Sequence, residues 1–364
     1  MKWPWTKESK FDILDRRGAE LRPIHYRDSQ TQGYSPHGIV ASDVELAISR
    51  ATPQMVAVAK AIVAASRAGK PVIFFLGGHV IKEGLSKCII SMLSNLQYGA
   101  VAGAGAMLVH DYEMSTWRGT SEYVEKTLPD GSFGMWEENT AINEIAKIAA
   151  KRKWGFGETT GWWLAAQGKC CASESLALWC WQNSVPYTVH TTIGGDVFYQ
   201  YPNCDGAAIG AASYRDFLIF ARLVKNLNRG GVFLNIGSSV HGPEVFLKAL
   251  SLARNVGRAK GERVRNFTTA VFDREMPNDG KDYTGADFTN DDQLYYWRPW
   301  KTVLRRSILE ADGSTCGESY FVQGEHALTV RVLQLLVNEL SKGKKIDRND
   351  DNSTTAAAAG AANS

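Results

Sequence analysis

Three glycine-containing turns have the residue types and positions expected of a phosphate-binding site. Each directly follows an apolar run with the composition of a buried strand. Without a β-carbon, glycine lets backbone N–H groups approach a phosphate, and the start of a following helix favours its negative charge. One such turn alone could be an ordinary tight turn, but three together favour a dinucleotide or a similar phosphate-bearing ligand. The turns are Gly77-Gly78, Gly103-Ala104-Gly105 and Gly237-Ser238-Ser239, none of which is a G-x-G-x-x-G.

The segments that must position these turns alternate between strand-like and helix-like patterns. Predicted strands cover residues 72–76, 98–102, 186–192, 231–236, 268–272 and 319–322. Predicted helices cover residues 54–67, 79–96, 137–151, 173–184, 214–226, 243–255 and 325–340. This alternation predicts an α/β fold with a mainly parallel sheet and helices on both faces. Ligands of such sheets bind at the carboxyl ends of the strands, near a switch in strand order.

Composition predicts one large globular domain with polar ends. The 364 residues are 44% hydrophobic and 22% charged, which is ordinary for a globular protein. We expect an N-terminal arm over residues 1–40, a domain over 41–342 and a disordered tail over 343–364. The net charge of +3 is too weak and dispersed to indicate nucleic-acid binding.

The cysteines and the apolar runs indicate a cytoplasmic location. No apolar run is long enough to span a bilayer, and the first residues lack the apolar region of a signal peptide. The six cysteines show no metal-ligand spacing, so we expect reduced thiols and no metal site.

Several motifs follow one another between about residues 22 and 340. They include Arg22-Pro23-Ile24, Leu76-Gly77-Gly78-His79, His110-Asp111-Tyr112-Glu113, Gly195-Asp196, Tyr214-Arg215-Asp216-Phe217, Leu234-Asn235-Ile236-Gly237-Ser238-Ser239, Pro243-Glu244-Val245-Phe246 and Trp297-Arg298-Pro299-Trp300-Lys301. In this order they resemble deoxyhypusine synthase and its bacterial deoxyhypusine-synthase-like relatives. The resemblance implies a Rossmann-like NAD-binding domain in a homotetramer, with active sites at a dimer interface.

The resemblance also implies a reaction. In the family, NAD takes a hydride from spermidine, diaminopropane leaves, and the butyl imine is held on a lysine. The imine passes to an acceptor amine and is then reduced by the NADH just formed. The bacterial-type motifs favour putrescine as acceptor, which gives homospermidine. A lysine of the hypusine-bearing translation factor remains an alternative acceptor, and a non-catalytic nucleotide-binding protein is a third possibility.

Lys301 is the predicted nucleophile, because the family has a lysine just after a tryptophan and ahead of the last strand. A lysine attacks an imine when desolvation or nearby cations favour its neutral form. Trp297 and Trp300 would supply aromatic faces to a polyamine. Lys301 could instead be a surface lysine whose stem lies over these rings.

Acidic residues are the predicted ligands of the polyamine's ammonium groups. Asp196 fits the family's amine-binding aspartate, although a loop aspartate often bonds its own backbone. Asp111 and Glu113 occupy the position of an acidic family residue that contacts cofactor and amine, and His110 could accept the proton lost in oxidation. A helix cap is the alternative for this group.

Other positions depart from the family pattern or complete the cofactor site. Glu244 stands where deoxyhypusine synthase places histidines, and it could equally be a stabilising charge at a helix start. His79 replaces the usual asparagine of the first turn. Glu325 lies where the family has an aspartate for the nicotinamide ribose, and it too could be only a helix-start charge. Thr269 and Ala270 complete the predicted cofactor contacts.

Overall fold

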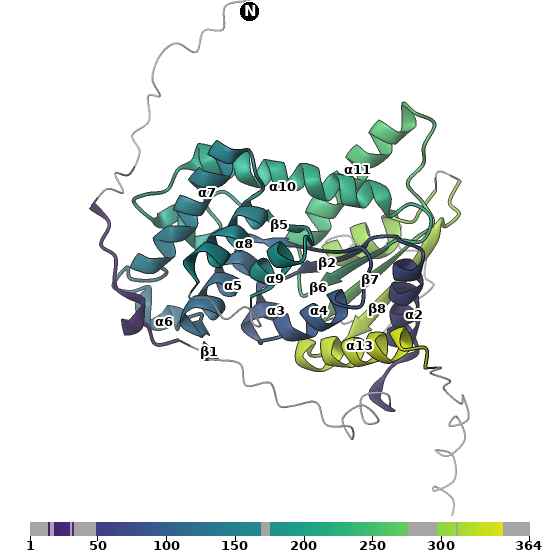
Figure 1. The fold of residues 1–364 in the computed structure, drawn as a ribbon, viewed down its shortest axis with the longest axis horizontal. Helices are drawn as coiled ribbons and strands as arrows, with labels where there is room; N and C mark the ends of the chain where they lie inside the picture. Colours follow the sequence, from purple (N-terminus) through teal and green to yellow (C-terminus); the bar gives the residue numbers. More distant parts are fainter. Residues whose placement is uncertain are drawn as a thin grey trace, which may run out of the picture.

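The computed structural model describes residues 14, 18–29, 31–32, 49–168, 175–275, 297–310 and 312–344 (Figure 1). Apart from residues 343 and 344, the predicted tail lies outside the described residues, as do parts of the predicted arm. No helix in the described ranges is long and apolar enough to cross a membrane.

A six-stranded parallel sheet forms the centre of the fold. Across the sheet the order is β5-β3-β2-β6-β7-β8. When these six strands are numbered by their order in the chain, the order across the sheet is 3-2-1-4-5-6, which is the Rossmann arrangement. The predicted α/β fold with helices on both faces is confirmed. The strands are β2 (Val72–Leu76), β3 (Gly99–Ala104), β5 (Tyr187–His190), β6 (Val232–Ile236), β7 (Phe267–Asp273) and β8 (Gly317–Gln323); β1 (Thr31–Gln32) and β4 (Gly119–Thr120) form a separate antiparallel pair.

The central strands are apolar along their whole length because both sheet faces are covered. In β2 every residue is buried, with Phe74 facing one core and Ile73 and Phe75 facing the other. Figure 1 shows the helices in two layers around the sheet. One layer contains α2 (Pro53–Arg67), α3 (Gly78–Lys82), α4 (Ser86–Leu93), α5 (Gly105–Trp117), α9 (Leu176–Gln182) and α13 (His326–Ser341), and the other is built mainly by α10 (Gly206–Asn226), α11 (His241–Arg258) and the π-helix η5 (Pro299–Arg306).

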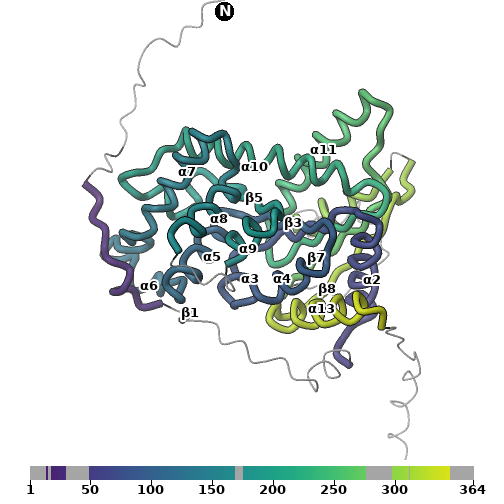
Figure 2. Tube along the Cα trace, in the orientation of Figure 1, coloured from purple at the N-terminus to yellow at the C-terminus, as the bar shows by residue number. Residues whose placement is uncertain are grey.

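Further helices lie beyond the β5 edge of the sheet. They are α6 (Val124–Thr127), α7 (Ala141–Arg152) and α8 (Phe156–Gln167), with the 3-10 turns η2 (Ile24–Tyr26), η3 (Glu137–Thr140) and η4 (Val197–Gln200). Residues 22–28 of the predicted arm run beside α6 (Figure 2). Arg22 exchanges backbone hydrogen bonds with Met135 and Glu137, so this part of the arm is docked on the domain.

Some predicted helices have different limits in the structure. The helix predicted over 79–96 is divided into α3 and α4, because Gly84 between them has a φ of +75° that no α-helix accommodates. The helix predicted over 214–226 begins earlier, at Gly206, where the Asp205 side chain accepts hydrogen bonds from Ala207 and Ala208. Helices α5, α8 and η5 were absent from the sequence prediction.

Candidate active site

The strand order reverses between β2 and β6, and two of the predicted glycine turns meet there. A β-carbon added to Gly77 would lie 1.9 Å from the carbonyl oxygen of Gly237. Only glycine allows the two turns to approach so closely. In a sheet of this order, dinucleotides bind at this switch point. The structure therefore brings the predicted cofactor residues Gly77, Gly78 and Gly237 together at the carboxyl edge.

The third glycine turn leads from β3 into α5. The first residue of α5 is Gly105, preceded by Ala104, and no side chain caps this helix start. Gly103 is buried at the end of β3, where an added β-carbon would lie 2.8 Å from the Leu76 carbonyl oxygen. The N-terminus of α5 thus lies beside the β2 turn, with backbone N–H groups suited to an anion.

His110 lies on α5 against the first glycine turn. A β-carbon on Gly78 would lie 3.0 Å from Cδ2 and 3.3 Å from Nε2 of this histidine. Its Nδ1 lies 2.7 Å from Thr120 Oγ1, which donates a 2.5 Å hydrogen bond to Glu113 Oε2. Glu113 in turn forms a buried ion pair with Arg27 from the N-terminal arm, at 2.6 Å.

This chain of contacts assigns the proton of His110. An ionised Glu113 only accepts hydrogen bonds, so Thr120 donates its one hydroxyl proton to the carboxylate. The Thr120 oxygen must then accept from His110, which places the imidazole proton on Nδ1 and leaves a lone pair on Nε2. Burial lowers the pKa of His110 to about 4, with Glu113 acting in the opposite direction. The ring is therefore neutral near pH 7 and offers Nε2 as a proton acceptor beside Gly78.

Asp196 lies above the start of α5. A β-carbon on Gly105 would lie 2.3 to 2.5 Å from its carboxylate atoms. The carboxylate accepts a 2.8 Å hydrogen bond from the Thr192 backbone N–H. Burial raises the pKa of Asp196 to about 6, opposed by this hydrogen bond. At neutral pH Asp196 is thus a half-buried carboxylate at the carboxyl edge, which is the environment a bound ammonium group requires.

The first turn of α11 connects Asp196 with Lys301. The backbone N–H of Thr192 donates to Asp196, and the Thr192 hydroxyl lies 3.1 Å from Nδ1 of His241. One turn further along α11, Glu244 pairs with Lys248 and lies 3.4 Å from Arg298. These cations and Lys301 hold the pKa of Glu244 below its usual value, with the Lys248 hydrogen bond contributing most. The Lys301 charge is therefore within interaction range of Glu244, and Thr192 links the loop that carries Asp196 to the start of α11.

Lys301 lies on η5, whose π-helical geometry is uncommon and often occurs at functional sites. The neighbouring Trp297 is half-buried, and its ring stacks on Trp300 at a centroid distance of 6.3 Å. Trp297 also packs edge-on against Phe321 of β8, at 5.4 Å. The packed rings fix the segment that carries Lys301.

Three predicted substrate contacts have other roles. Asp111 is fully buried and accepts hydrogen bonds from the backbone of Leu176 and Ala177, so it caps α9. Glu113 positions His110 as described above, and its other oxygen is shared by Arg27 and Asn139. Trp300 is 6% exposed and belongs to the core under α11, which corrects its predicted contact with substrate.

Of the remaining predicted cofactor residues, some are buried or structural and others lie at the carboxyl edge of the sheet. Thr269 and Ala270 are fully buried in the middle of β7, and the Thr269 hydroxyl donates to Val303, so neither reaches the carboxyl edge. Ser238 accepts a hydrogen bond from the Gly242 N–H and so stabilises the start of α11, while Ser239 is exposed beside it. His79 and Glu325 do lie at the carboxyl edge.

His326 is a buried histidine at this edge that sequence reasoning missed. A β-carbon on Gly237 would lie 2.9 Å from its Nε2. Its side chain is 3% exposed, and neither ring nitrogen has a hydrogen-bond partner among the described residues. Burial is the main cause that lowers the pKa of His79, and Arg274 and His326 add to it, so these groups lie near one another. Arg274 pairs with Glu325, which joins the β7 and β8 ends to the β2 turn.

His241 was also missed, because the sequence prediction began its helix at Pro243 and placed no histidine there. The available signal was a histidine two positions after the turn Gly237-Ser238-Ser239. The described residues contain no group of three potential ligands that could hold a metal ion.

Comparisons with known proteins leave the family open. No protein-family profile matches the chain, and no curated protein does. Similar solved structures include apo ArgZ, an arginine dihydrolase from the ornithine–ammonia cycle in cyanobacteria (13% identity, TM-score 0.44, 80% of this chain and 32% of that chain). They also include the ternary complex of AgrE with ornithine and NAD+ (15%, 0.44, 83% and 34%) and a conserved protein assigned to LOR/SDH from Methanococcus maripaludis S2 (13%, 0.44, 88% and 74%).

This chain spans about a third of the length of ArgZ and AgrE. At this identity and TM-score, the likenesses carry no argument about function. None of the three is described as a deoxyhypusine synthase, so the resemblance seen in the motifs stays a prediction. The chemistry available comes from the chain's own residues: a neutral imidazole and a carboxylate at the glycine-lined strand ends, and the Glu244 carboxylate with the Lys301 amine near the start of α11.

Proposed function

We propose that this chain is an NAD-dependent aminobutyltransferase that acts on spermidine and forms homospermidine with putrescine as acceptor. The observation that carries the proposal is the meeting of Gly77 and Gly237 at the switch point of a 3-2-1-4-5-6 sheet. The His110 imidazole lies against Gly78 and the Asp196 carboxylate against Gly105, and Lys301 is placed in the same site as part of the proposal. The motif order that resembles deoxyhypusine synthase supplies the reaction class.

The residues at the switch point fit a dinucleotide. The glycine pair keeps side chains out of the two turns, so a diphosphate could approach their backbone closely. Glu325, which pairs with Arg274, would accept a hydrogen bond from a ribose hydroxyl, and His326 presents an unpartnered ring at Gly237. Bound NAD would accept the hydride of the amine and return it at the end of the cycle.

The chain's own residues would divide the remaining work. Asp196 and Glu244 would hold ammonium groups of spermidine, which orients its secondary amine towards the cofactor. His110 Nε2 would accept the amine proton as two electrons leave with the hydride. The Lys301 amine would then displace diaminopropane and hold the butyl imine. Attack by the acceptor amine would release Lys301, and return of the hydride together with the proton held by His110 would complete homospermidine, so that atoms and electrons balance.

A dimer interface at this edge is part of the proposal, within a homotetramer. Large apolar side chains are exposed on three segments close to the candidate site. Ile193, Tyr214 and Val240 are 80%, 62% and 61% exposed. An apolar surface of this kind is suited to contact with a second subunit. Light scattering of the purified chain would measure the oligomer.

One assay separates the candidate functions. The protein is incubated with NAD and labelled spermidine, with and without putrescine. Release of diaminopropane with labelled homospermidine supports the proposal. Label found only on the hypusine-bearing translation factor, when that protein is added, supports deoxyhypusine synthesis instead. Absence of NAD-dependent cleavage in both reactions would leave a non-catalytic nucleotide-binding protein.

A lysine variant tests the covalent step. Lys301→Ala should abolish transfer and retain NAD binding, because its amine is needed only after the oxidation. Lys60→Ala, an exposed lysine on α2, is the matched control and should keep full activity. Borohydride trapping should label the native protein and not Lys301→Ala. Undiminished transfer by that variant would refute the role of Lys301.

A further inference from the structure

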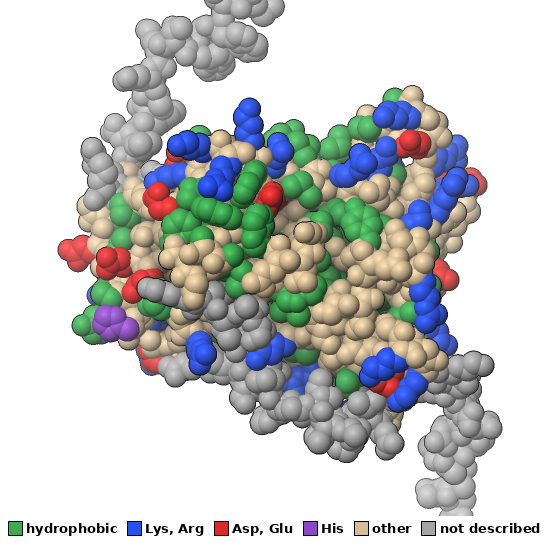
Figure 3. Space-filling view, in the orientation of Figure 1, with side chains coloured by type: hydrophobic (Ala, Val, Ile, Leu, Met, Phe, Trp, Pro, Cys, Tyr) green, Lys and Arg blue, Asp and Glu red, His purple; other side chains and the backbone are tan. Residues whose placement is uncertain are grey.

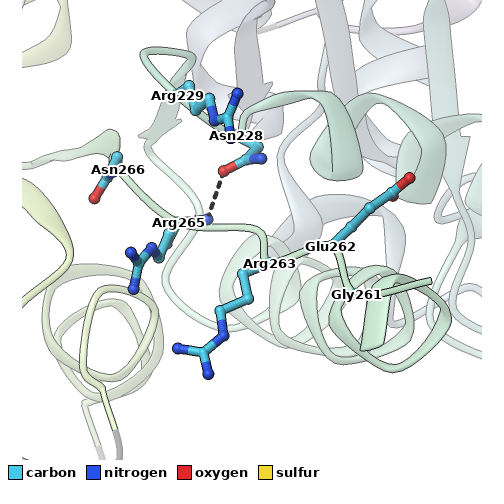
Figure 4. Close-up of a pocket in the computed structure, with 7 residues that line it drawn as sticks. All are labelled: Asn228, Arg229, Gly261, Glu262, Arg263, Arg265 and Asn266. Carbon is cyan, nitrogen blue, oxygen red and sulfur yellow. Dashed lines mark hydrogen bonds between the residues drawn. The ribbon is translucent and has the colours of Figure 1, made fainter. Parts of the chain in front are cut away.

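Two adjoining cavities lie at the amino-terminal ends of β6 and β7, on the sheet edge opposite the candidate active site. Their volumes are about 600 and 520 Å³. Segment 261–265 contributes to the lining of both. The first cavity also contains Asn228, Arg229 and Asn266, which directly precede the two strands (Figure 4). The second is completed by α11 and by residues 309–310.

The two linings are strongly basic. Together they contain five arginines, and only two acidic residues: Arg229, Arg254, Arg258, Arg263 and Arg265 stand against Glu262 and Glu310. The excess is as large as the net charge of the whole chain, which is +3. Figure 3 shows Lys and Arg side chains gathered over the C-terminal end of α11.

The two acidic residues are already engaged. Glu262 forms an ion pair with Lys225 at 2.7 Å, and Glu310 lies 3.6 Å from Arg265. Within the described ranges, Arg229, Arg258 and Arg263 have no carboxylate partner. Positive charges gathered in adjoining cavities repel one another unless an anion lies between them.

The basic residues are carried by a tied backbone. Arg229 N–H donates to the Arg265 carbonyl at 3.0 Å, and Arg265 N–H donates to the Asn228 side chain at 3.1 Å (Figure 4). Arg254 donates from its guanidinium to the carbonyls of Val264 and Ser307. The two walls of the first cavity are therefore linked by hydrogen bonds.

Arg229 also has a left-handed backbone, with a φ of +64°. This conformation costs a side chain with a β-carbon about 1 kcal/mol, and glycine would adopt it without strain. Arg258 is explained by the helix end that it occupies, because a cation stabilises a helix C-terminus. Arg229 and Arg263 lie in loops, where that explanation does not apply.

We propose that these cavities form a binding site for a small molecule that carries two or more phosphate groups. One guanidinium group can donate two parallel hydrogen bonds to the oxygens of a phosphate. Arg263 and Arg265 extend from alternate positions of one segment (Figure 4). Cavities of this size suit a small ligand. Neither lining contains an aromatic side chain in the described part of the chain, so recognition rests on the phosphates and not on stacking of a base.

The test is calorimetric titration of inorganic tripolyphosphate into the full-length chain at low ionic strength, with and without NAD. We expect a dissociation constant below about 1 mM that weakens with added salt. NAD that only just saturates the cofactor site should leave the probe bound, because that site lies at the other sheet edge, whereas a large excess of NAD could compete through its own diphosphate. Arg263→Gln with Arg265→Gln should weaken binding by roughly tenfold or more. Arg67→Gln with Arg215→Gln removes the same charge from exposed positions elsewhere and should leave binding unchanged.

Other outcomes would overturn the proposal. They are absence of binding by the native chain, or equal weakening in both double variants. Circular dichroism checks that the variants are folded. Should the first double variant not fold, Arg229→Gln tests the opposite wall, and unchanged affinity there would equally refute the site.

Discussion

The buried ion pair between Arg27 and Glu113 allows a quantitative test of how the N-terminal arm is held. Both side chains are 3% exposed, and their nearest charged atoms lie 2.6 Å apart. Arg27 also donates to the Gly119 carbonyl at 3.0 Å and to the Ser29 hydroxyl at 3.1 Å. Arg27→Met keeps much of the volume and removes all three contacts.

The main cost of this change is the carboxylate that remains buried without its cation. Breaking a buried pair in this way destabilises proteins by about 3–5 kcal/mol. Since a domain is typically stable by about 5–15 kcal/mol, a large share of the folding free energy should be lost. We expect Arg27→Met to lower the urea midpoint in proportion, with an unchanged slope.

The double variant Arg27→Met with Glu113→Gln separates this cause from lost packing. Without the buried charge, it should be more stable than Arg27→Met alone, although less stable than the native chain. A loss below about 1 kcal/mol in Arg27→Met, which is the size of an exposed pair, would refute the docking of the arm. A double variant less stable than the single variant would refute the electrostatic explanation.

Three further changes test other parts of the structure. Gly77→Ala should lower stability by about 1–3 kcal/mol and abolish NAD binding, measured by urea unfolding and calorimetry, because its β-carbon would overlap Gly237; Gly210→Ala, with open space inside α10, should be neutral or stabilising. His326→Ala should weaken NAD binding by roughly tenfold without loss of fold, whereas equal affinity would exclude a cofactor contact. Burial raises the pKa of Asp216 to about 8, so its folded state retains a proton that the unfolded state releases near 4, and stability should fall by up to about 1.4 kcal/mol per pH unit between these values. Asp216→Asn should reduce that slope in urea titrations from pH 6 to 8, and an unchanged slope would contradict the assignment.

The sheet could be predicted from the sequence because its strands are short apolar runs that end in glycine turns. Val72–Leu76 and Val232–Ile236 are buried at every position, and the predicted limits agree with them to within a residue. Helix α5 could not be predicted in the same way, since it buries Asp111 and Glu113 as well as its apolar residues and so lacks a polar face. Lys301 lies on a π-helix, whose backbone hydrogen bonds join residues five apart instead of four. No pattern of side chains reveals this difference.

The sequence could not distinguish acidic residues that reach the site from acidic residues that serve the fold. Asp111 and Asp196 both come after glycine turns, and by type alone they are equivalent. Their partners differ: Asp111 accepts hydrogen bonds from the first turn of α9, while Asp196 keeps a carboxylate at the carboxyl edge. The deciding atoms come from a segment more than sixty positions away, which spacing along the chain cannot reveal.

The arm and the candidate base form one unit, although they are far apart in the sequence. Arg27 fixes Glu113 as an acceptor, Glu113 orients the hydroxyl of Thr120, and Thr120 places the imidazole proton of His110. A change at Arg27 should therefore alter the tautomer of the His110 ring, which lies against Gly78, although Arg27 does not contact that ring. Nitrogen chemical shifts of His110 would report this: Nε2 should appear as the unprotonated nitrogen in the native chain and as a mixture in Arg27→Met. An unchanged spectrum would show that α5 and β4 orient the ring by packing alone, and that the docked arm serves stability and not the acid–base chemistry.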